Sequence, residues 1–200
     1  GQPALAITDH GNMYGVKDFC DVAKNHPSVK PIIGCEIYVT QHYDHRLKDS
    51  EHRKYYHLIL LAKNYEGYKN LIKIVSTGHL EGKYYEKPRV THQIVEKYHE
   101  NLICCSACLA GEIPKKILAG DIQGADEAIE WHKRVFGEDY YLEVMLHKTE
   151  VPGMSLDLYQ KQKEYTSEIF RLAEKHGVKV VATNDVHFIN KDDGPVHDRL

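Results

Sequence analysis

Long apolar runs, a strong net charge and a paired-cysteine framework are all missing from this 200-residue sequence. No stretch approaches the roughly 18 consecutive apolar residues that a membrane helix needs, and the first residues do not resemble a signal peptide. The formal net charge is only -3, which gives no global basic field to attract a nucleic acid backbone. The five cysteines are an odd number, and we expect reduced thiols, a cytoplasmic location and no membrane partner.

Several catalytic motifs are absent as well. The sequence contains no phosphate-binding loop of the G-x-x-x-x-G-K-[ST] type, no G-x-G-x-x-G fingerprint and no G-x-S-x-G nucleophile elbow. Cys105 and Cys108 form one C-x-x-C pair, but no second pair follows at useful spacing. By contrast, fourteen histidines are present, and histidine is the commonest metal ligand. Among enzyme classes, the sequence therefore favours a metal-centred hydrolase.

Apolar segments alternate regularly with helical patterns along the chain. Apolar runs predict strands at residues 4–8, 30–39, 57–62, 101–107, 140–145 and 178–183. Helical spacing predicts helices at residues 14–25, 65–80, 112–119, 122–136 and 155–176. Apolar strands separated by helices are typical of a parallel sheet, so we expect one α/β domain, either a barrel or an open doubly wound sheet. The polar segment 40–56 is expected to be an exposed loop. Its histidines His42, His45 and His52 could bind metal as a His-rich tract, but a solvated loop is favoured.

Metal-type side chains follow three of the predicted strands. Asp9 and His10 follow the first strand, Cys108 follows the fourth, and Asp185 and His187 follow the last. In parallel α/β folds, functional side chains gather at the carboxyl ends of the strands. The sequence therefore predicts a metal site at this edge, and its mixed ligand types suit zinc, manganese or iron.

The sequence supports some of these candidate metal ligands more strongly than others. Asp185 and His187 would point to the same side of an extended backbone, although a capping Asp and a core His are an equal alternative. Glu36 lies inside an apolar strand, where an inward carboxylate is costly unless it is paired or coordinated; it could also point outward. Glu143 is a weaker candidate of the same kind. His57 begins a strand, so by pattern it is a core or edge histidine.

Five segments resemble motifs of the PHP (polymerase and histidinol phosphatase) domain. They are AITDHGNMYG (6–15), PIIGCE (31–36), HLILLAKNYEGYKNL (57–71), SACLAGEIP (106–114) and ATNDVHF (182–188). Their form is similar to the branch of the family found in the alpha subunits of bacterial DNA polymerase III. The matches run in order along essentially the whole chain.

The resemblance implies a distorted (β/α)7 barrel whose strand ends hold up to three divalent metals, zinc or manganese. Carried over by position, the implied metal ligands are His10, Glu36, His57, Cys108, Asp185 and His187. Asp9 is implied as a partner of these ligands. The first motif of the family, a His-x-His on the first strand, would precede residue 1, so we expect residues 1–200 to be part of a longer protein, with a barrel lacking its first strand.

The resemblance also implies a function. The domain would be a metal-dependent phosphoesterase in a DNA-directed DNA polymerase, with Asp185 and Glu36 as catalytic residues. A DNA 3′ end would be the substrate of 3′–5′ exonuclease proofreading, and released pyrophosphate is another possible substrate. The implied partners are DNA, the other polymerase domains and a proofreading exonuclease subunit. A scaffold that stabilises the polymerase and docks that subunit is the alternative, and a small-molecule phosphatase is a weaker one.

Overall fold

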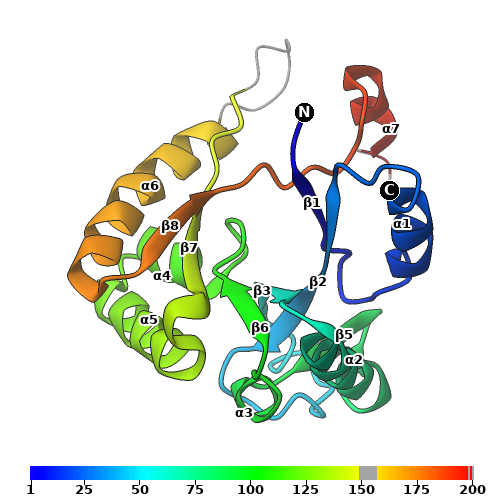
Figure 1. Ribbon diagram of the computed structural model, residues 1–200. Helices are drawn as coiled ribbons and strands as arrows, with labels where there is room; N and C mark the ends of the chain where they lie inside the picture. The colour runs from blue at the N-terminus through cyan, green and yellow to red at the C-terminus, as the bar shows by residue number, and fades with distance from the viewer. Residues whose placement is uncertain (149–156, 198, 200) are drawn as a thin grey trace.

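The computed structural model describes residues 1–148, 157–197 and 199, and its strands form one curved sheet (Figure 1). The eight strands of this sheet are β1 (Ala4–Ile7), β2 (Lys30–Thr40), β3 (Tyr55–Ala62), β4 (Lys83–Tyr84), β5 (Lys87–Val90), β6 (Leu102–Cys105), β7 (Tyr140–Val144) and β8 (Lys179–Ala182). Six of them coincide with the predicted strands. The two short strands β4 and β5 were not predicted.

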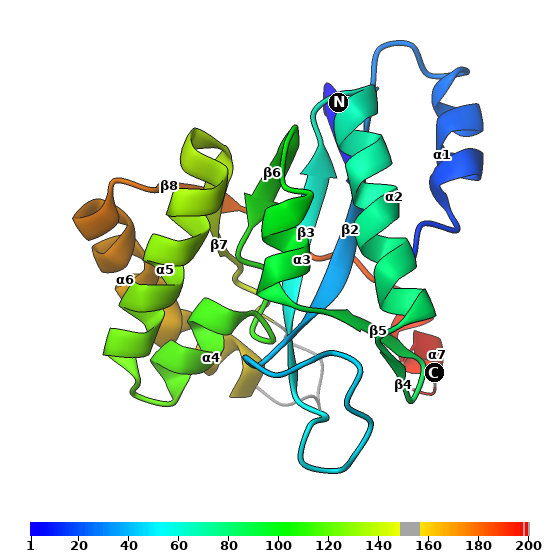
Figure 2. The ribbon, with the colours of Figure 1, turned by 90° about the horizontal axis from the view of Figure 1, so that it is seen from below.

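Helices cover the outer face of the sheet (Figures 1 and 2). The α-helices are α1 (Val16–Ala23), α2 (Tyr65–Leu80), α3 (His92–Lys97), α4 (Glu112–Leu118), α5 (Ile122–Phe136), α6 (Asp157–His176) and α7 (Gly194–His197), with short 3-10 helices η1 (Gly137–Asp139) and η2 (Lys191–Asp193). The prediction of a helix at 155–176 is confirmed from Asp157 onward, and residues 155 and 156 lie outside the described residues. None of the helices in the described residues is long and apolar enough to cross a membrane.

The sheet is mixed, so the expectation of a parallel sheet is confirmed only in part. Strand β2 runs parallel to β1 and β5, and β6, β7 and β8 are parallel to one another. Strand β3, however, is antiparallel to both of its neighbours, β2 and β6. The reason is local: no helix separates β2 from β3, and the loop 41–54 returns the chain directly beside β2.

The sheet forms an arc whose two sides are not joined. Within the described residues, β1 pairs with β2 and β8 pairs with β7, and no strand pairing connects β1 to β8. The chain after β8 crosses the open side of the arc toward β1 and then reaches α7 (Figure 1). The α/β class is therefore confirmed, whereas closure into a barrel is not observed.

Alternation along β2 separates the core from the opposite face. Cys35, Ile37 and Val39 are buried in the apolar cluster that includes helix residues such as Leu71 and Ile129. Because successive side chains of a strand point to opposite faces, the residues between them face away from these helices. One of these residues is Glu36, whose surroundings are described next.

Candidate metal centre

Glu36 is the central residue of a polar cluster on the inner face of the sheet. The residue is only 2% exposed, and its Oε1 lies 2.5 Å from Nδ1 of His10 and 2.8 Å from Nδ1 of His57. Burial alone would raise the pKa of Glu36, but the hydrogen bonds with the two imidazoles outweigh it and lower the pKa to about 2. The Glu36 carboxylate is therefore ionised at neutral pH. Of the two orientations left open by the sequence, the Glu36 side chain has the inward one.

His57 reaches Glu36 because β3 runs in reverse. In the antiparallel register His57 is opposite Tyr38, which places it diagonally across from Glu36. The amino end of β3 consequently lies beside the carboxyl ends of its neighbours, where the strand-end rule expects functional side chains. The rule missed His57 because it assumes that all strands run in one direction.

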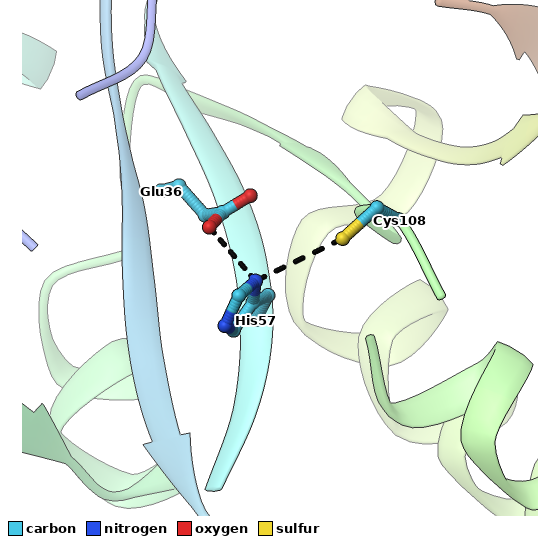
Figure 3. A group of neighbouring side chains, drawn as sticks. All are labelled: Glu36, His57 and Cys108. Atoms are coloured by element: carbon cyan, nitrogen blue, oxygen red, sulfur yellow. Dashed lines mark hydrogen bonds and ion pairs between the residues drawn. The ribbon is translucent and has the colours of Figure 1, made fainter. Parts of the chain in front are cut away.

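Cys108 completes a compact group with Glu36 and His57 (Figure 3). Its Sγ lies 3.8 Å from Nδ1 of His57, and one ligand atom of each of the three residues lies within 4.8 Å of the others. Burial raises the pKa of the Cys108 thiol to about 11, so the thiol is protonated in this state. Since the thiolate is the form that binds metals, a bound cation would displace this proton.

His10 and His187 bring the two ends of the chain together. Their Nε2 atoms are 3.1 Å apart, and their rings are 5.2 Å apart between centroids. His187 Nδ1 donates to the carbonyl oxygen of Asp185 at 2.8 Å, which leaves the lone pair of His187 on Nε2. The hydrogen bond with Glu36 raises the pKa of His10, and the negative charge of Asp185 contributes in the same direction.

Asp185 is near the cluster, but not through the geometry that the sequence suggested. Its φ is +46°, in the left-handed region, and no strand is present at residues 183–188. The premise of an extended backbone is therefore wrong at Asp185. The Asp185 side chain is 28% exposed, and its charge acts on both His10 and Cys108.

Asp9 has a different position from the other candidates. Its Oδ2 accepts a hydrogen bond from the backbone N–H of Gly15 at 3.1 Å, just before α1. Its carbonyl oxygen accepts from the N–H of Glu36 at 3.1 Å. Asp9 thus holds the backbone that carries Glu36, while its carboxylate binds the start of α1.

Tyr38 and Tyr55 are neighbours of the cluster that the sequence reasoning did not select. The Tyr38 ring lies 5.3 Å from the His57 ring, and the Tyr55 ring stacks on His57 at 5.9 Å with an interplanar angle of 4°. Alternation in β2 would have indicated Tyr38, since it shares the face of Glu36.

The donor atoms of this cluster fit divalent metal ions. A buried carboxylate, imidazole nitrogens and a thiol are the ligand types of zinc and related transition metals. Two imidazole Nε2 atoms face each other at 3.1 Å, and two imidazole Nδ1 atoms converge on one carboxylate oxygen. A divalent cation could be coordinated by these converging nitrogen and oxygen atoms, which would offset the cost of burying them.

Comparison with known proteins agrees with the resemblance to the PHP domain. The profile of the PHP domain matches residues 1–147. DNA polymerase III subunit alpha of Treponema pallidum is 42% identical over 204 residues, and that of Borreliella burgdorferi is 42% identical over 196 residues. That of Deinococcus radiodurans is 37% identical over 203 residues. These alignments cover 97–100% of this chain but only 14–16% of the relatives, so the chain spans about a sixth of their length.

Proposed function

The chain belongs to the PHP-domain family, and from this premise we propose that the Glu36 cluster is a metal-dependent phosphoesterase site within a bacterial replicative DNA polymerase alpha subunit. The observation that carries the proposal is the buried, ionised Glu36 carboxylate held between two imidazoles. An isolated buried carboxylate would be strongly destabilising, so this arrangement supports a functional site. The curved sheet is proposed to be an arc of the distorted (β/α)7 barrel that the family resemblance implies.

The proposed metal ligands are the six residues singled out by the resemblance: His10, Glu36, His57, Cys108, Asp185 and His187. A divalent zinc or manganese ion held there would activate a water molecule and stabilise charge on phosphate oxygens. Glu36, fixed in β2, supplies the buried negative charge on which the imidazoles converge. Asp185 is the more exposed carboxylate, and we assign it the role of orienting the attacking water and accepting its proton.

The proposed substrate is the 3′ end of DNA, cleaved by 3′–5′ exonuclease action that would proofread newly made strands. The net charge of -3 gives this domain little attraction for DNA, so other domains of the polymerase would bring the DNA end to the site. The parent chain would be a cytoplasmic DNA-directed DNA polymerase. A docking surface for a separate proofreading subunit is the alternative role.

The test uses the full-length chain that carries this domain. A 3′-labelled DNA strand is incubated with Mn²⁺ and with the wild type, Asp185→Asn or the control Asp192→Asn. We expect Asp185→Asn to reduce hydrolysis at least about 100-fold, typical of losing a positioned acid–base group, and to reduce bound metal, while the fold is kept. Asp192, an exposed acid on η2, should be replaceable without effect.

Equal hydrolysis by wild type and Asp185→Asn would place the activity outside this site. Absence of hydrolysis in the wild type, together with retention of a separate exonuclease subunit on the polymerase, would favour the scaffold role.

A further inference from the structure

A second cluster of metal-type side chains lies outside the candidate metal centre. His92, Glu112 and His132 each offer one ligand atom within 4.8 Å of the others. Glu112 is 6% exposed, and its Oε2 accepts a hydrogen bond from Nε2 of His92 at 3.0 Å. His42 Nε2 lies 3.5 Å from the other carboxylate oxygen, and the His42 ring stacks on that of His92.

Four separate parts of the chain meet at this cluster. His42 is in the loop between β2 and β3, His92 is the first residue of α3, Glu112 is the first residue of α4, and His132 is in α5. Ligands contributed by several elements fix those elements relative to one another, as in structural metal sites. None of these side chains belongs to the ligand set proposed above.

The His132 ring is held in one tautomer. Its Nδ1–H donates to the carbonyl oxygen of Ala128 at 2.8 Å, which leaves the lone pair on Nε2. The ring is 2% exposed and stacks on Tyr140 at 5.0 Å with an interplanar angle of 13°. Metal-binding histidines commonly donate their second ring N–H to a backbone carbonyl in this way.

The Glu112 carboxylate has imidazoles at both of its oxygens. Its Oε2 accepts a hydrogen bond from Nε2 of His92 at 3.0 Å, and its Oε1 lies 3.5 Å from Nε2 of His42. A ring nitrogen of His132 lies within 4.8 Å of ligand atoms of both His92 and Glu112. Glu112 and His132 are only 6% and 2% exposed, so these polar groups converge away from solvent. Buried polar groups are costly unless they are paired or coordinate a metal.

We propose that His92, Glu112 and His132 form a second, structural binding site for a divalent cation such as Zn²⁺, with His42 as a fourth ligand from the loop. Two imidazoles and one carboxylate hold zinc in some catalytic sites, and His42 would supply the fourth ligand that a closed structural site has. A cavity of about 420 Å³ lined by His42 and His92, among others, gives the ion a path to the site. The competing arrangement is a network of hydrogen bonds and ion pairs, which Lys116 would join at 3.9 Å from Glu112.

The second site would position the segment that carries Cys108. Gly111 N–H donates to Cys108 O at 2.8 Å, and His57 N–H donates to Ala110 O at 3.0 Å. A side chain at Gly111 would lie 2.1 Å from the Ser106 carbonyl oxygen, so this turn requires glycine. A cation on Glu112, the next residue, would hold the turn in place from its other end.

The test counts zinc in the full-length chain after metal removal and reloading with Zn²⁺ alone. We expect His92→Gln and His132→Gln each to lose one zinc per chain, and the double variant to lose no more than either. His99→Gln is the matched control, because His99 also donates Nδ1–H to a backbone carbonyl, that of Glu96 at 2.6 Å. The same loss should appear in a Glu36→Gln background, so this result is independent of the proposed phosphoesterase site.

Melting temperature gives a second readout. Zn²⁺ should raise the melting temperature of Cys108→Ser, but should raise it less after His132→Gln is added. Full zinc content in both single variants would overturn the proposal and leave the hydrogen-bonded network. If neither variant folds, the test uses crystals of the zinc-loaded wild type, with diffraction measured at the zinc absorption edge. An anomalous peak between His92 and Glu112 supports the site, and the absence of this peak overturns the proposal.

Discussion

At the scale of single residues, Glu36 and Glu143 are both buried in the sheet, yet their surroundings shift the pKa values of the two carboxyl groups in opposite directions. Glu36 has two imidazoles beside it and a pKa of about 2. Glu143, 3% exposed, accepts hydrogen bonds from two neutral donors, the N–H of Ala107 at 2.5 Å and the hydroxyl of Thr183 at 2.9 Å. Burial raises the pKa of Glu143 to about 7, and these hydrogen bonds only partly oppose the rise. Glu143 thus connects the ends of β6 and β8.

Replacing Glu143 by Gln should remove a pH dependence of stability. Because the pKa of Glu143 is raised from 4.5 to about 7 on folding, its contribution to stability is complete below pH 4.5 and is lost as the pH rises through 7. Relative to Glu143→Gln, the wild type should lose up to about 3 kcal/mol of unfolding free energy between these limits. Urea unfolding at several pH values, with chelator present, measures this difference. Parallel pH profiles for the wild type and Glu143→Gln would contradict it, and Glu138→Gln, at an exposed site, is the control.

Some candidate residues could be selected from the sequence by local rules alone. Glu36 was recognisable because a carboxylate inside an apolar strand must have a partner if it faces inward. Recognising His57 as a candidate ligand requires either the family resemblance or knowledge that β3 is antiparallel. The sequence of β3 itself does not reveal that direction. The spacing of Asp185 and His187 indicated two nearby ligands, but the positive φ of Asp185 depends on how the chain leaves β8.

At the scale of elements, Arg89 in β5 organises the loop 41–54. The residue is fully buried, and its guanidinium donates to the carbonyl oxygens of His45, Leu47, His52 and Gly82 at 2.5–3.1 Å. The loop was predicted to be exposed and solvated, and this is wrong for His45, which is 6% exposed. A buried cation surrounded by carbonyl oxygens explains how a polar loop without a helix or strand keeps one shape.

Arg89→Met should release this loop. Each carbonyl left without a donor costs about 1–3 kcal/mol, so the free energy of local opening should fall by about 3 kcal/mol. Trypsin cleavage within the loop, after Arg46, Lys48, Arg53 or Lys54, should then become about 100-fold faster. The control is Arg134→Met, at a side chain that is 60% exposed. Equal cleavage rates for Arg89→Met and the control would show that Arg89 does not hold the loop.

The elements that sequence reasoning missed are short or depend on distant partners. Strand β4 has only two residues, and β5 has the sequence KPRV, in which polar and charged residues interrupt any apolar run. The antiparallel course of β3 arises because the chain turns back through a loop stabilised by Arg89, a residue far along the sequence. The longer strands and helices, by contrast, followed from apolar periodicity alone.

At the scale of the whole molecule, the candidate metal centre exists only because the curved sheet brings distant segments together. His10 and His187 are 177 positions apart in sequence, yet their Nε2 atoms lie 3.1 Å apart and their ring centroids 5.2 Å apart. Composition and periodicity could not predict this contact. The family resemblance implied both residues as ligands of one cluster. In the structure, contacts link His10 and His57 to Glu36, Cys108 to His57, and His187 to His10 and Asp185.

The measurement that tests the central claim most directly is the metal content of the full-length chain, wild type against Glu36→Gln, after dialysis with a weak chelator. Glu143→Gln is the matched control, because it also replaces a buried strand glutamate by glutamine without removing a proposed ligand. The account predicts that Glu36→Gln loses at least one zinc or manganese ion per chain that the wild type and Glu143→Gln both retain. Equal metal content in all three proteins would contradict a metal centre built on Glu36.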